Sequence, residues 1–499
     1  MVFVILNDNI QYMLNKLVVD TVTIRKDRLK KLREIGINPY PHTSDRQQTN
    51  KEIKNMLGKQ IVVAGRIMGK RGHGKLIFLD LVDETDKVQL FISHKIIGEE
   101  LFKIANLLDI GDFLEASGLV FKTVVGEISV KCSFLKILSK ALQPLPSTWY
   151  GLQNVEDRYR KRYLDFIINP ESKKIIELRS KIVSEVRKIL EVKGFLEIET
   201  PTLQPIYGGA NARPFQTYYN ALKQDFYLKI SDELYLKRLI IGGFEKVFEI
   251  DHNFRNEGID ATHNPEFTMM ECYWAYADYN QIMELTEEIY SKVSKKVLGT
   301  TKVNYNGFDI DLKAPWERLT MVDAIKKYLK IDTEKLTDEE LKQKAKKLKV
   351  EEGVRGGLFN RGLTVFSLFE LVEDKLIDPV FITDFPKETT SLCKLHRDNP
   401  ELIERFEPYI GGKEIGNAYT ELNDPDLQRH FFEEEVKAKL DGNNETHPLD
   451  EDFLTSMEYG MPPTGGLGLG IDRMVMIMTG THSIRDVIAF PTLRSKKAK

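Results

Sequence analysis

Hydrophobic and polar positions follow two different patterns along the chain. Between residues 60 and 140 the apolar runs are short and are separated by Gly and Asp, which predicts β-strands at 60–67, 75–81, 87–92 and 113–120. After residue 150 apolar residues recur at helical spacing over 175–190, and Gly194 is expected to end that helix. A short strand that stops at Pro201 follows. The chain therefore divides into an all-β part and a part that mixes helices with strands.

The all-β part has the element order of an OB barrel. A helical stretch near residues 97–108 interrupts its strands, and five strands with a helix partway through suit that fold. Before it, residues 25–33 carry six basic side chains against one acidic and predict a helix that ends near Gly36 and Pro39. This helix is either a solvated charged surface or a surface that faces nucleic-acid phosphates.

We expect three regions of an α+β protein. They are an N-terminal basic helical extension over residues 1–55, an OB-fold β-barrel over 56–145 and an antiparallel-sheet domain flanked by helices over 146–499. Residues 143–148 have the composition of a linker. Residues 317–350 are lysine-rich and helical in pattern, as in a helical insertion between two parts of a β core.

Composition excludes several classes of protein. With 42% hydrophobic and 29% charged residues, the chain is not globally disordered. A net charge of −3 excludes a uniformly basic coat for nucleic acid, although not a local basic patch. No apolar run is long enough for a membrane-spanning helix, and residues 1–6 make a poor signal peptide. Three distant cysteines without a CxxC pair favour neither a disulfide framework nor a zinc site, so a reducing, cytoplasmic location is expected.

The densest group of reactive side chains lies between residues 254 and 273. Two strands are expected there, running antiparallel, and the alternation of side chains places Arg255 and Glu257 on one face of the first. The corresponding face of the second strand carries Phe267, Met269, Glu271 and Tyr273. If these faces coincide, a guanidinium, carboxylates, an aromatic ring and a phenol gather above one sheet. The alternative is an open sheet face covered by salt bridges, because unpaired charges are costly to bury.

A second group lies between residues 407 and 421. Asn417, Tyr419 and Glu421 alternate onto one face of a strand, whereas Glu414 has the opposite parity and is not placed by this argument. Glu407 lies seven residues before Glu414. Two carboxylates beside substrate phosphates would suit Mg²⁺, although glutamate is common in this chain.

A third group is glycine-rich and spans residues 464–480. Its spacing is GxGxG rather than GxGxxG, and only 29 residues follow Gly470, which excludes a dinucleotide-binding domain. A strand on which glycines let a flat ligand lie against the backbone fits better. Arg473 is then on the first turn of the next helix, where it can face an anion.

These stretches resemble the three motifs of class II aminoacyl-tRNA synthetases. The helix and strand ending at Pro201 resemble motif 1, residues 254–273 motif 2 and residues 466–478 motif 3. The preceding barrel is similar to the anticodon-binding OB domain of the subgroup that charges aspartate, asparagine and lysine. The resemblance runs from about residue 25 to 494, and the signature motifs of class I enzymes are absent.

Within this subgroup the chain resembles the lysine enzymes. The aspartate enzymes carry a Pro-Pro-His-Gly-Gly pattern where residues 462–466 are Pro-Pro-Thr-Gly-Gly. The carboxylates of Glu233, Glu271 and Glu421 suit a substrate with two ammonium groups. A short paralogue that lysylates an elongation factor lacks the barrel. Two alternatives stay open: an aspartate or asparagine enzyme, and a non-catalytic tRNA-binding relative, which would be expected to have lost some of the motif residues.

The resemblance implies a lysine–tRNA ligase that forms lysyl-adenylate from L-lysine and ATP and then charges tRNA(Lys). It implies a homodimer, through motif 1, and Mg²⁺ as cofactor, bound by Glu407 and Glu414. Arg255 and Arg473 would be catalytic. The implied ATP-binding residues are Arg255, Glu257, His263, Asn264, Phe267, Glu407, Gly470 and Arg473. The implied lysine-binding residues are Gly209, Glu233, Glu271, Tyr273, Asn417, Tyr419 and Glu421.

The same resemblance assigns the reading of the anticodon to Arg71, Phe78 and Gln89. An aromatic ring at Phe78 can stack on a base, and the amide of Gln89 can contact a base edge. Three of the implied roles have structural alternatives. Phe78 and Tyr419 could be packing residues, and His263 could be an ordinary polar surface residue.

Overall fold

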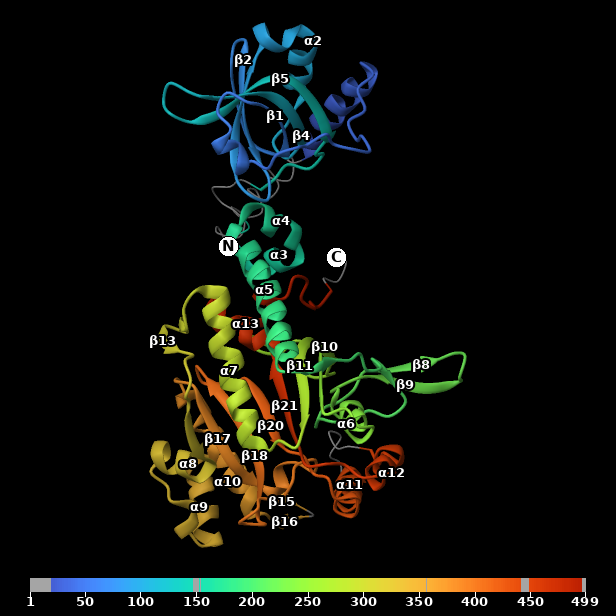
Figure 1. Cartoon of the computed structure of the whole chain (residues 1–499), viewed down its shortest axis with the longest axis vertical. Coiled ribbons are helices and arrows are strands. Elements are labelled where there is room, and N and C mark those ends of the chain that lie inside the picture. Colours follow the sequence, from blue (N-terminus) through green and yellow to red (C-terminus); the bar gives the residue numbers. More distant parts are fainter. Residues whose placement is uncertain (1–18, 147–151, 153, 356, 441–447, 496–499) are drawn as a thin grey trace, which may run out of the picture. The chain divides into compact units, whose positions relative to one another are not determined.

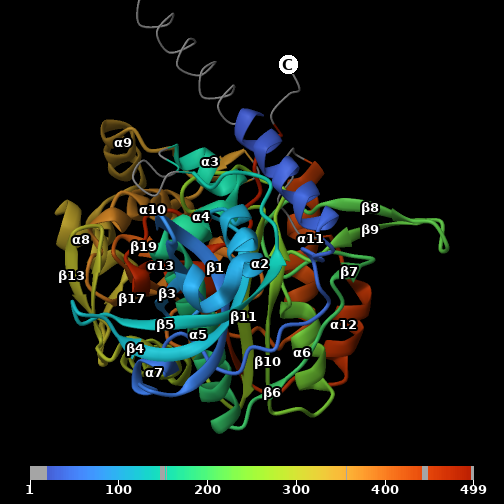
Figure 2. The same cartoon turned by 90° about the horizontal axis from the view of Figure 1, so that it is seen from above.

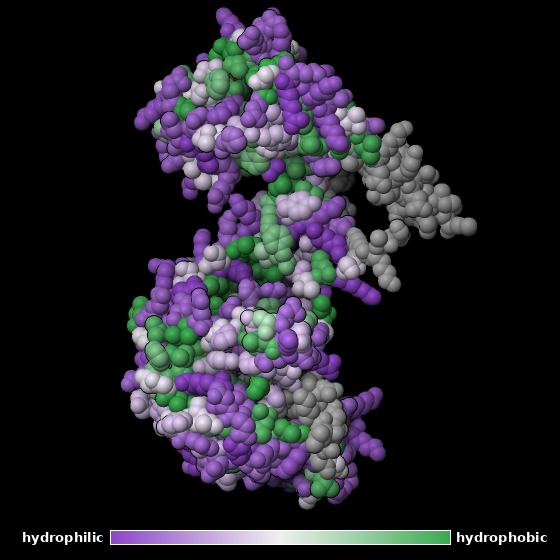
Figure 3. Space-filling view, turned by 90° about the vertical axis from the view of Figure 1, so that its right-hand side faces the viewer, coloured by the Kyte–Doolittle hydropathy of each residue, from purple (hydrophilic) through white to green (hydrophobic). Residues whose placement is uncertain are grey.

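The structure is a computed structural model that describes residues 19–146, 152, 154–355, 357–440 and 448–495 (Figure 1). Its contacts divide the chain into two compact units, residues 1–152 and 153–499. The apolar run at residues 1–6 and the end of the expected linker, 147–148, lie outside the described residues. No helix in the described part is long and apolar enough to cross a membrane. The face seen in Figure 3 is mostly hydrophilic with scattered hydrophobic residues, as expected for the composition.

The first unit is a closed five-stranded barrel with strand order β1-β2-β3-β5-β4. Its elements are β1 (Gln60–His73), β2 (Leu76–Val82), β3 (Lys87–Ser93), α2 (His94–Leu107), β4 (Phe113–Lys122) and β5 (Ile128–Ser139). Alternate residues of β2, namely Ile77, Leu79 and Leu81, point into the barrel core, as period-2 alternation requires. The predicted OB barrel with a helix between its third and fourth strands is confirmed.

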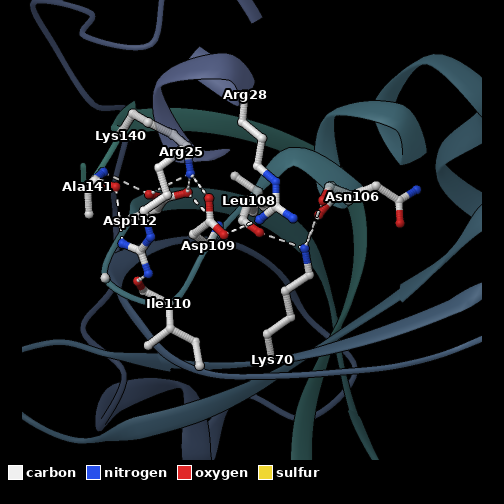
Figure 4. A network of polar contacts seen from close by, with 12 residues as sticks. Arg25, Arg28, Lys70, Asn106, Leu108, Asp109, Ile110, Asp112, Lys140 and Ala141 are labelled. Carbon is white, nitrogen blue, oxygen red and sulfur yellow. Dashed lines mark hydrogen bonds and ion pairs between the residues drawn. The ribbon is translucent and has the colours of Figure 1, made fainter. Parts of the chain in front are cut away.

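A helix over residues 19–34 packs on this barrel with one face. Leu32 belongs to the barrel core, and the guanidinium of Arg25 donates to the carbonyls of Ala141, Gln143 and Ile110 at 3.1, 2.9 and 3.0 Å (Figure 4). The basic stretch is therefore only partly a solvated surface, and contact of its exposed residues with phosphates stays a prediction. Arg25 and Arg28 hold the helix on the barrel, and its exposed basic residues are Lys26, Lys30, Lys31 and Arg33.

A buried ion network joins the end of β5 to the loop before β4. The fully buried ammonium of Lys140 donates to both oxygens of Asp112 at 3.1 and 2.8 Å and also pairs with Asp109 (Figure 4). Next to it, the ammonium of Lys70 donates to the carbonyls of Ala105, Asn106 and Leu108, where α2 ends. Burial lowers the pKa of Lys70 to about 8.

The second unit is built on a nine-stranded sheet in the order β14-β17-β18-β20-β21-β11-β10-β6, with β19 beside β18. The strands are β14 (Glu317–Thr320), β17 (Val380–Pro386), β18 (Leu402–Ile410), β19 (Lys413–Glu414), β20 (Gly416–Thr420), β21 (Thr464–Gly470), β11 (Glu266–Ala275), β10 (Lys246–Phe254) and β6 (Leu196–Glu197). All pairs are antiparallel except the two outermost, β14 with β17 and β10 with β6. The predicted antiparallel sheet is confirmed.

Three helices cover one face of this sheet, α5 (Pro170–Val192), α7 (Tyr279–Leu298) and α13 (Ile471–Thr479) (Figure 1). Helix α5 begins at Pro170, two residues before Ser172. Proline suits the first turn of a helix because it lacks the N–H group that would be left unpaired there. Asp472 at the start of α13 accepts from the amide of Thr268 at 2.7 Å and pairs with Arg179 of α5. These contacts attach α5, α13 and β11 to one another.

The remaining elements surround the sheet, and Figure 2 shows the β8–β9 hairpin projecting from it. The helices are α3 (Val155–Arg160), α4 (Arg162–Ile168), α6 (Glu233–Ile241), α8 (Met321–Leu329), α9 (Asp338–Leu348), α10 (Arg361–Glu370), α11 (Pro425–Leu440), α12 (Glu451–Glu458) and α14 (Ile484–Val487). The small strands are β7 (Leu203–Gln204), β8 (Gln216–Tyr219), β9 (Gln224–Leu228), β12 (Lys302–Tyr305), β13 (Phe308–Asp311), β15 (Val354–Arg355) and β16 (Leu358–Phe359). The segment 317–350 differs from a purely helical insertion, because its first four residues form β14, the edge of the main sheet.

Replacing Lys140 by Met should destabilise the barrel. The change leaves Asp112 buried without its cation, and breaking a buried pair in this way costs about 3–5 kcal/mol. Hydrogen exchange of the amides of β1–β5 measures the loss. The matched control is Lys136→Met, which removes an ion pair to the largely exposed Asp45 and should cost less than about 1 kcal/mol. Equal effects of the two variants would contradict the role given to the buried network.

Candidate functional site

A cavity of about 230 Å³ opens on the sheet face opposite α5, α7 and α13. All seven residues that the resemblance assigned to lysine binding line it: Gly209, Glu233, Glu271, Tyr273, Asn417, Tyr419 and Glu421. Met269, Glu271 and Tyr273 come from one face of β11, whereas Met270 and Cys272 point into the hydrophobic core on the other side. The alternation expected for residues 267–273 is therefore confirmed, and Cys272 is a core residue.

The glycines of β21 make room for the acidic end of the cavity. Strand β21 lies between β11 and β20, so that Gly466 is opposite both Tyr273 and Tyr419. A Cβ atom on Gly466 would lie 1.8 Å from Oε1 of Glu421 and 2.7 Å from the ring of Tyr273. The sequence suggested that these glycines admit a flat ligand, but at Gly466 the space is taken by a side chain of the protein.

Two carboxylates and one buried lysine form the acidic end. Lys237 donates to Oε1 of Glu233 at 2.5 Å and forms an ion pair with Oε2 of Glu421. The hydroxyl of Tyr419 donates to the other oxygen of Glu233 at 3.0 Å. Oε1 of Glu421 is buried without a hydrogen-bond partner among the described residues. Burial raises the pKa of Glu421 to about 8, although Lys237 acts in the opposite direction.

Glu271 is a third carboxylate in the same cavity. Its Oε1 accepts from the hydroxyl of Ser231 at 2.9 Å and from the amide of Asp232 at 3.2 Å, and its Oε2 accepts from the hydroxyl of Tyr273 at 3.4 Å. Burial raises the pKa of Glu271 well above its usual range, and nearby acids add to the shift. A cationic ligand would relieve this cost by compensating the buried charge.

Gly209 closes the cavity from the loop between β7 and β8. Its φ of +87° is in the left-handed region, which favours glycine. A Cβ atom there would lie 2.7 Å from the hydroxyl of Ser231 and 2.9 Å from Cβ of Glu233. Backbone conformation and close approach both require glycine at this position.

The basic end of the cavity is formed by Arg255. Its guanidinium lies 5.1 Å from the ring centroid of Phe267, and its Nε is buried without a hydrogen-bond partner in the described part of the chain. Burial lowers the pKa of Arg255, and Glu257, Glu414 and Glu271 oppose that shift. An unpaired guanidinium in a cavity is a site for an oxyanion such as a carboxylate or a phosphate.

Arg473 lies beyond Arg255, on the first turn of α13 after Gly470. Its Nη1 donates to the backbone carbonyl of Glu414 at 2.6 Å and to Oε2 of the same residue at 3.2 Å. Its Nη2 is 3.4 Å from Nε2 of His263, whose Nδ1 lies 2.7 Å from Asp260. Tertiary structure thus places Glu414, which strand parity left unplaced, beside Arg473.

The start of the loop between β10 and β11 differs from what the sequence predicted. Strand β10 ends at Phe254, so neither Arg255 nor Glu257 lies on a strand face, and Glu257 is exposed. Its carboxylate accepts from the amide of Arg213 at 3.4 Å. Asn264 is buried, and its amide nitrogen donates to the backbone carbonyl of Glu266 at 2.6 Å, which holds the loop against β11.

Glu407 and Glu414, the two carboxylates expected to bind metal, lie close enough for Glu414 to influence Glu407. Burial raises the pKa of Glu407 to about 7, with Glu414 adding to the shift and Arg405 opposing it. Glu407 accepts from Arg405 at 2.5 Å and from the hydroxyl of Tyr409 at 2.8 Å. The described residues contain no group of three side chains that could hold a metal by themselves. Mg²⁺ commonly takes one or two carboxylates together with substrate phosphates, so this donor pair fits it.

Arg405, Lys237 and Ser231 belong to the site although none was selected from the sequence. Arg405 is two residues before Glu407 in β18, so side-chain alternation could have placed both on the same strand face. Arg405 donates to the side-chain oxygen of Asn417 at 3.1 Å. Lys237 follows Glu233 by four residues in α6, the spacing of a helical ion pair. Ser231 carried no signal, because its contact with Glu271 joins residues forty positions apart.

The three residues assigned to the anticodon lie on the outer face of the barrel in the first unit. Phe78 is not in the barrel core and contacts Phe91 edge to face at a centroid distance of 5.4 Å. Arg71 pairs with Asp80 at 3.0 Å. Gln89 is buried, and its amide nitrogen donates to Glu127 at 3.1 Å. Aromatic rings beside basic side chains are typical of a surface for single-stranded nucleic acid.

Comparisons with known proteins agree with this arrangement. The family model for tRNA synthetases class II (D, K and N) matches residues 154–494, and the model for an OB-fold nucleic acid binding domain matches residues 61–138. A protein of Thermoanaerobacter pseudethanolicus named lysine–tRNA ligase is 48% identical over 499 residues, covering 98% of this chain and 99% of the relative. Proteins of the same name from Carboxydothermus hydrogenoformans and Clostridium novyi are also 48% identical, over 96% and 95% of this chain. The chain therefore belongs to the class II tRNA synthetases of the aspartate, lysine and asparagine group.

Proposed function

We propose that this chain is a lysine–tRNA ligase, which activates L-lysine with ATP and transfers the lysyl group to tRNA(Lys). One observation carries the choice of amino acid. The cavity buries three carboxylates, Glu233, Glu271 and Glu421, and is also lined by Arg255, whose Nε has no hydrogen-bond partner among the described residues. A substrate with two ammonium groups and one carboxylate complements these charges.

The first step of the proposed reaction is in-line attack by the lysine carboxylate on the α-phosphorus of ATP, which gives lysyl-adenylate and pyrophosphate. The carboxylate is already a nucleophile, so the protein contributes position and charge. Arg255 bridges the attacking carboxylate and the α-phosphate, because a guanidinium offers parallel N–H donors. Phe267, below it, stacks on adenine, and Arg473 covers the other face and extends toward the γ-phosphate.

The substrate's two ammonium groups go to opposite sides of the acidic end. Gly209 and Glu233 take the α-amino group, and Tyr273 with the unpaired oxygen of Glu421 takes the ε-ammonium. Glu271, Asn417 and Tyr419 complete the pocket. Buried carboxylates of this kind are ionised most readily when a cation compensates them.

The remaining ATP contacts come from the loop between β10 and β11 and from the acid pair. His263 and Asn264 contact phosphates, Glu257 the adenine amino group, and Gly470 the nucleotide along the end of β21. Glu407 and Glu414 would hold Mg²⁺, which would supply positive charge to neutralise the phosphates.

In the second step the terminal ribose hydroxyl of tRNA attacks the carbonyl carbon of lysyl-adenylate, so that the lysyl ester forms, the acyl–phosphate bond breaks and AMP leaves. We propose that residues 56–145 read the anticodon through Arg71, Phe78 and Gln89, that residues 1–55 support this domain, and that residues 146–499 carry the chemistry. The enzyme acts as a homodimer through the α5 and β6 region, following the role of motif 1 in the family, and works in the cytoplasm.

An aspartate enzyme is the closest alternative. Its pocket must offer a free cation to the side-chain carboxylate. Arg405 lines this cavity, but its guanidinium forms an ion pair with Glu407 and a hydrogen bond with Asn417. The cavity therefore favours a cationic side chain over an anionic one.

ATP–pyrophosphate exchange, measured with each of the twenty amino acids in turn, tests the proposal. Lysine should support exchange far better than any other amino acid, because its ε-ammonium compensates a buried carboxylate. Exchange that depends on aspartate or asparagine would reject the lysine assignment. Absence of exchange with every amino acid would favour a non-catalytic relative.

Arg255→Ala should reduce exchange by about 10²–10³-fold without unfolding the protein, because one preorganised charge at the reacting phosphate is lost. The measurement is kcat for exchange alongside a thermal unfolding curve. Arg429→Ala is the control, since Arg429 pairs with the surface residue Glu451 and does not line the cavity. If Arg255→Ala keeps near-normal exchange, Arg255 is not the phosphate-binding residue.

Glu421→Gln should lower kcat/KM for lysine by an amount equivalent to about 3–5 kcal/mol, because the ammonium is then buried without a full counter-charge. The KM for ATP should stay unchanged. Glu404→Gln is a matched control, since Glu404 is also buried but pairs with Arg397 outside the cavity. A loss below about threefold in kcat/KM would assign the ε-ammonium to Glu233 or Glu271 instead.

A further inference from the structure

One buried cation of the site has no part in the reaction described so far. Lys237, on the second turn of α6, is fully buried and lies between Glu233 and Glu421. Its ammonium also lies 5.9 Å from the ring centroid of Tyr419. It therefore contacts the two carboxylates that are proposed to receive the substrate's two ammonium groups.

Lys237 supports the cavity wall without lining it. The residues around the cavity include Glu233 and Glu421 but not Lys237. The lysine occupies one oxygen of each carboxylate. Of the other two oxygens, that of Glu233 accepts from Tyr419 and that of Glu421 has no hydrogen-bond partner among the described residues. Lys237 thus fixes the orientation of both carboxylates from the side that faces away from the cavity.

The charges of the pocket balance a diammonium substrate only when Lys237 is included. Three carboxylates, those of Glu233, Glu271 and Glu421, surround the cavity. The ammonium of Lys237 compensates one of these charges and leaves two, which equals the number of ammonium groups of lysine. The substrate's own carboxylate is matched separately by Arg255.

We propose that Lys237 is a positioning and specificity-determining residue, which orients Glu233 and Glu421 and favours the charged form of Glu421, so that the pocket accepts an amino acid with a second ammonium group. The inference rests on the proposed lysine activation. It adds that the ability to bind the ε-ammonium depends on a cation that never touches the substrate.

The charged groups around Glu421 explain how Lys237 affects binding of the ε-ammonium. Glu421 is surrounded by Lys237 and Glu233 from α6, Tyr273 from β11, Tyr419 from β20, and Cys393. Only Lys237 among these is a cation. Burial already raises the pKa of Glu421 to about 8, and Lys237 is the main influence that lowers it. Without Lys237 the carboxyl group would keep its proton to still higher pH, so binding of an ammonium would have to displace a more tightly held proton.

Because Lys237 favours the charged form of Glu421, its removal should have an effect that depends on pH. In Lys237→Met the KM for lysine should rise about tenfold or more relative to wild type at neutral pH, because the carboxyl group of Glu421 then gives up its proton less readily. The ratio of the two KM values should shrink as the pH rises above about 8, where Glu421 of the wild type is already charged and only that of the variant gains charge. The KM for ATP should stay the same. A lysine that only fills space would give a ratio that is independent of pH.

The experiment measures KM and kcat for lysine and ATP by pyrophosphate exchange across this pH range, together with lysine binding by calorimetry without ATP. Lys237→Arg keeps the charge and should restore most of the binding. Lys229→Met is the matched control, since Lys229 is equally buried and is held by Asp232, Glu249 and Asp251 at 2.8, 3.0 and 2.9 Å. None of those three carboxylates lines the cavity, so its loss should lower stability without a pH-dependent change in the KM ratio.

A second comparison keeps the test decisive if Lys237→Met folds poorly. Lys237→Met combined with Glu421→Gln removes both the cation and its partner, so less charge is left unpaired. If Lys237 acts through Glu421, the double variant should bind lysine no more weakly than Glu421→Gln alone. Fully additive losses, or a Lys237→Met ratio that does not change with pH, would overturn the inference. Failure of the wild type to activate lysine would instead reject the proposed function.

Discussion

Burial of three carboxylates around one small cavity is the constraint on which the architecture of the second unit depends. Each buried carboxylate needs donors or a cation, because an uncompensated buried charge costs several kcal/mol, on the order of 3–5. The chain supplies them from separate elements: a backbone amide and Ser231 for Glu271, Tyr419 for Glu233, and Lys237 for Glu233 and Glu421. One acceptor, Oε1 of Glu421, is left without a hydrogen-bond partner among the described residues, and it is there that a cationic ligand gains most.

The sheet makes this concentration of charge possible by separating two environments. One face of β11, β20 and β21 packs on α5, α7 and α13 and is apolar, as Met270, Ala418 and Leu469 show. The opposite face carries the charged groups, and the glycines of β21 leave the volume that they need. The rigid apolar layer holds side chains from distant segments in fixed relation, which preorganised electrostatic catalysis requires.

In the barrel of the first unit, the same alternation of side chains separates an apolar core from the outer face. Its interior is aliphatic, and its outer face carries Phe78, Arg71 and Gln89. The buried pairs of Lys140 and the contacts of Arg25 attach the N-terminal helix and the chain after β5 to that barrel. Basic residues are thus divided between those that hold the unit together and those that stay exposed.

Local periodicity determined much of the fold and part of the site. The OB barrel, the antiparallel pair β10–β11 and the face that carries Met269, Glu271 and Tyr273 all follow from period-2 alternation, which depends only on residues within one strand. The family of the chain also follows from sequence motifs that occur in order. The individual roles of the site residues remain predictions.

Tertiary structure decided the rest, because strand pairing and ion pairing join residues far apart in the chain. Alternation could not show that β21 lies between β11 and β20, and hence that Gly466 gives its space to Glu421. Alternation also placed Glu257 on a strand, but that strand ends at Phe254. Where a strand ends depends on the strands beside it as well as on its own residues. Whether Lys237 of α6 meets Glu421 depends on how a helix packs on a sheet nearly two hundred residues away, which no local pattern reports.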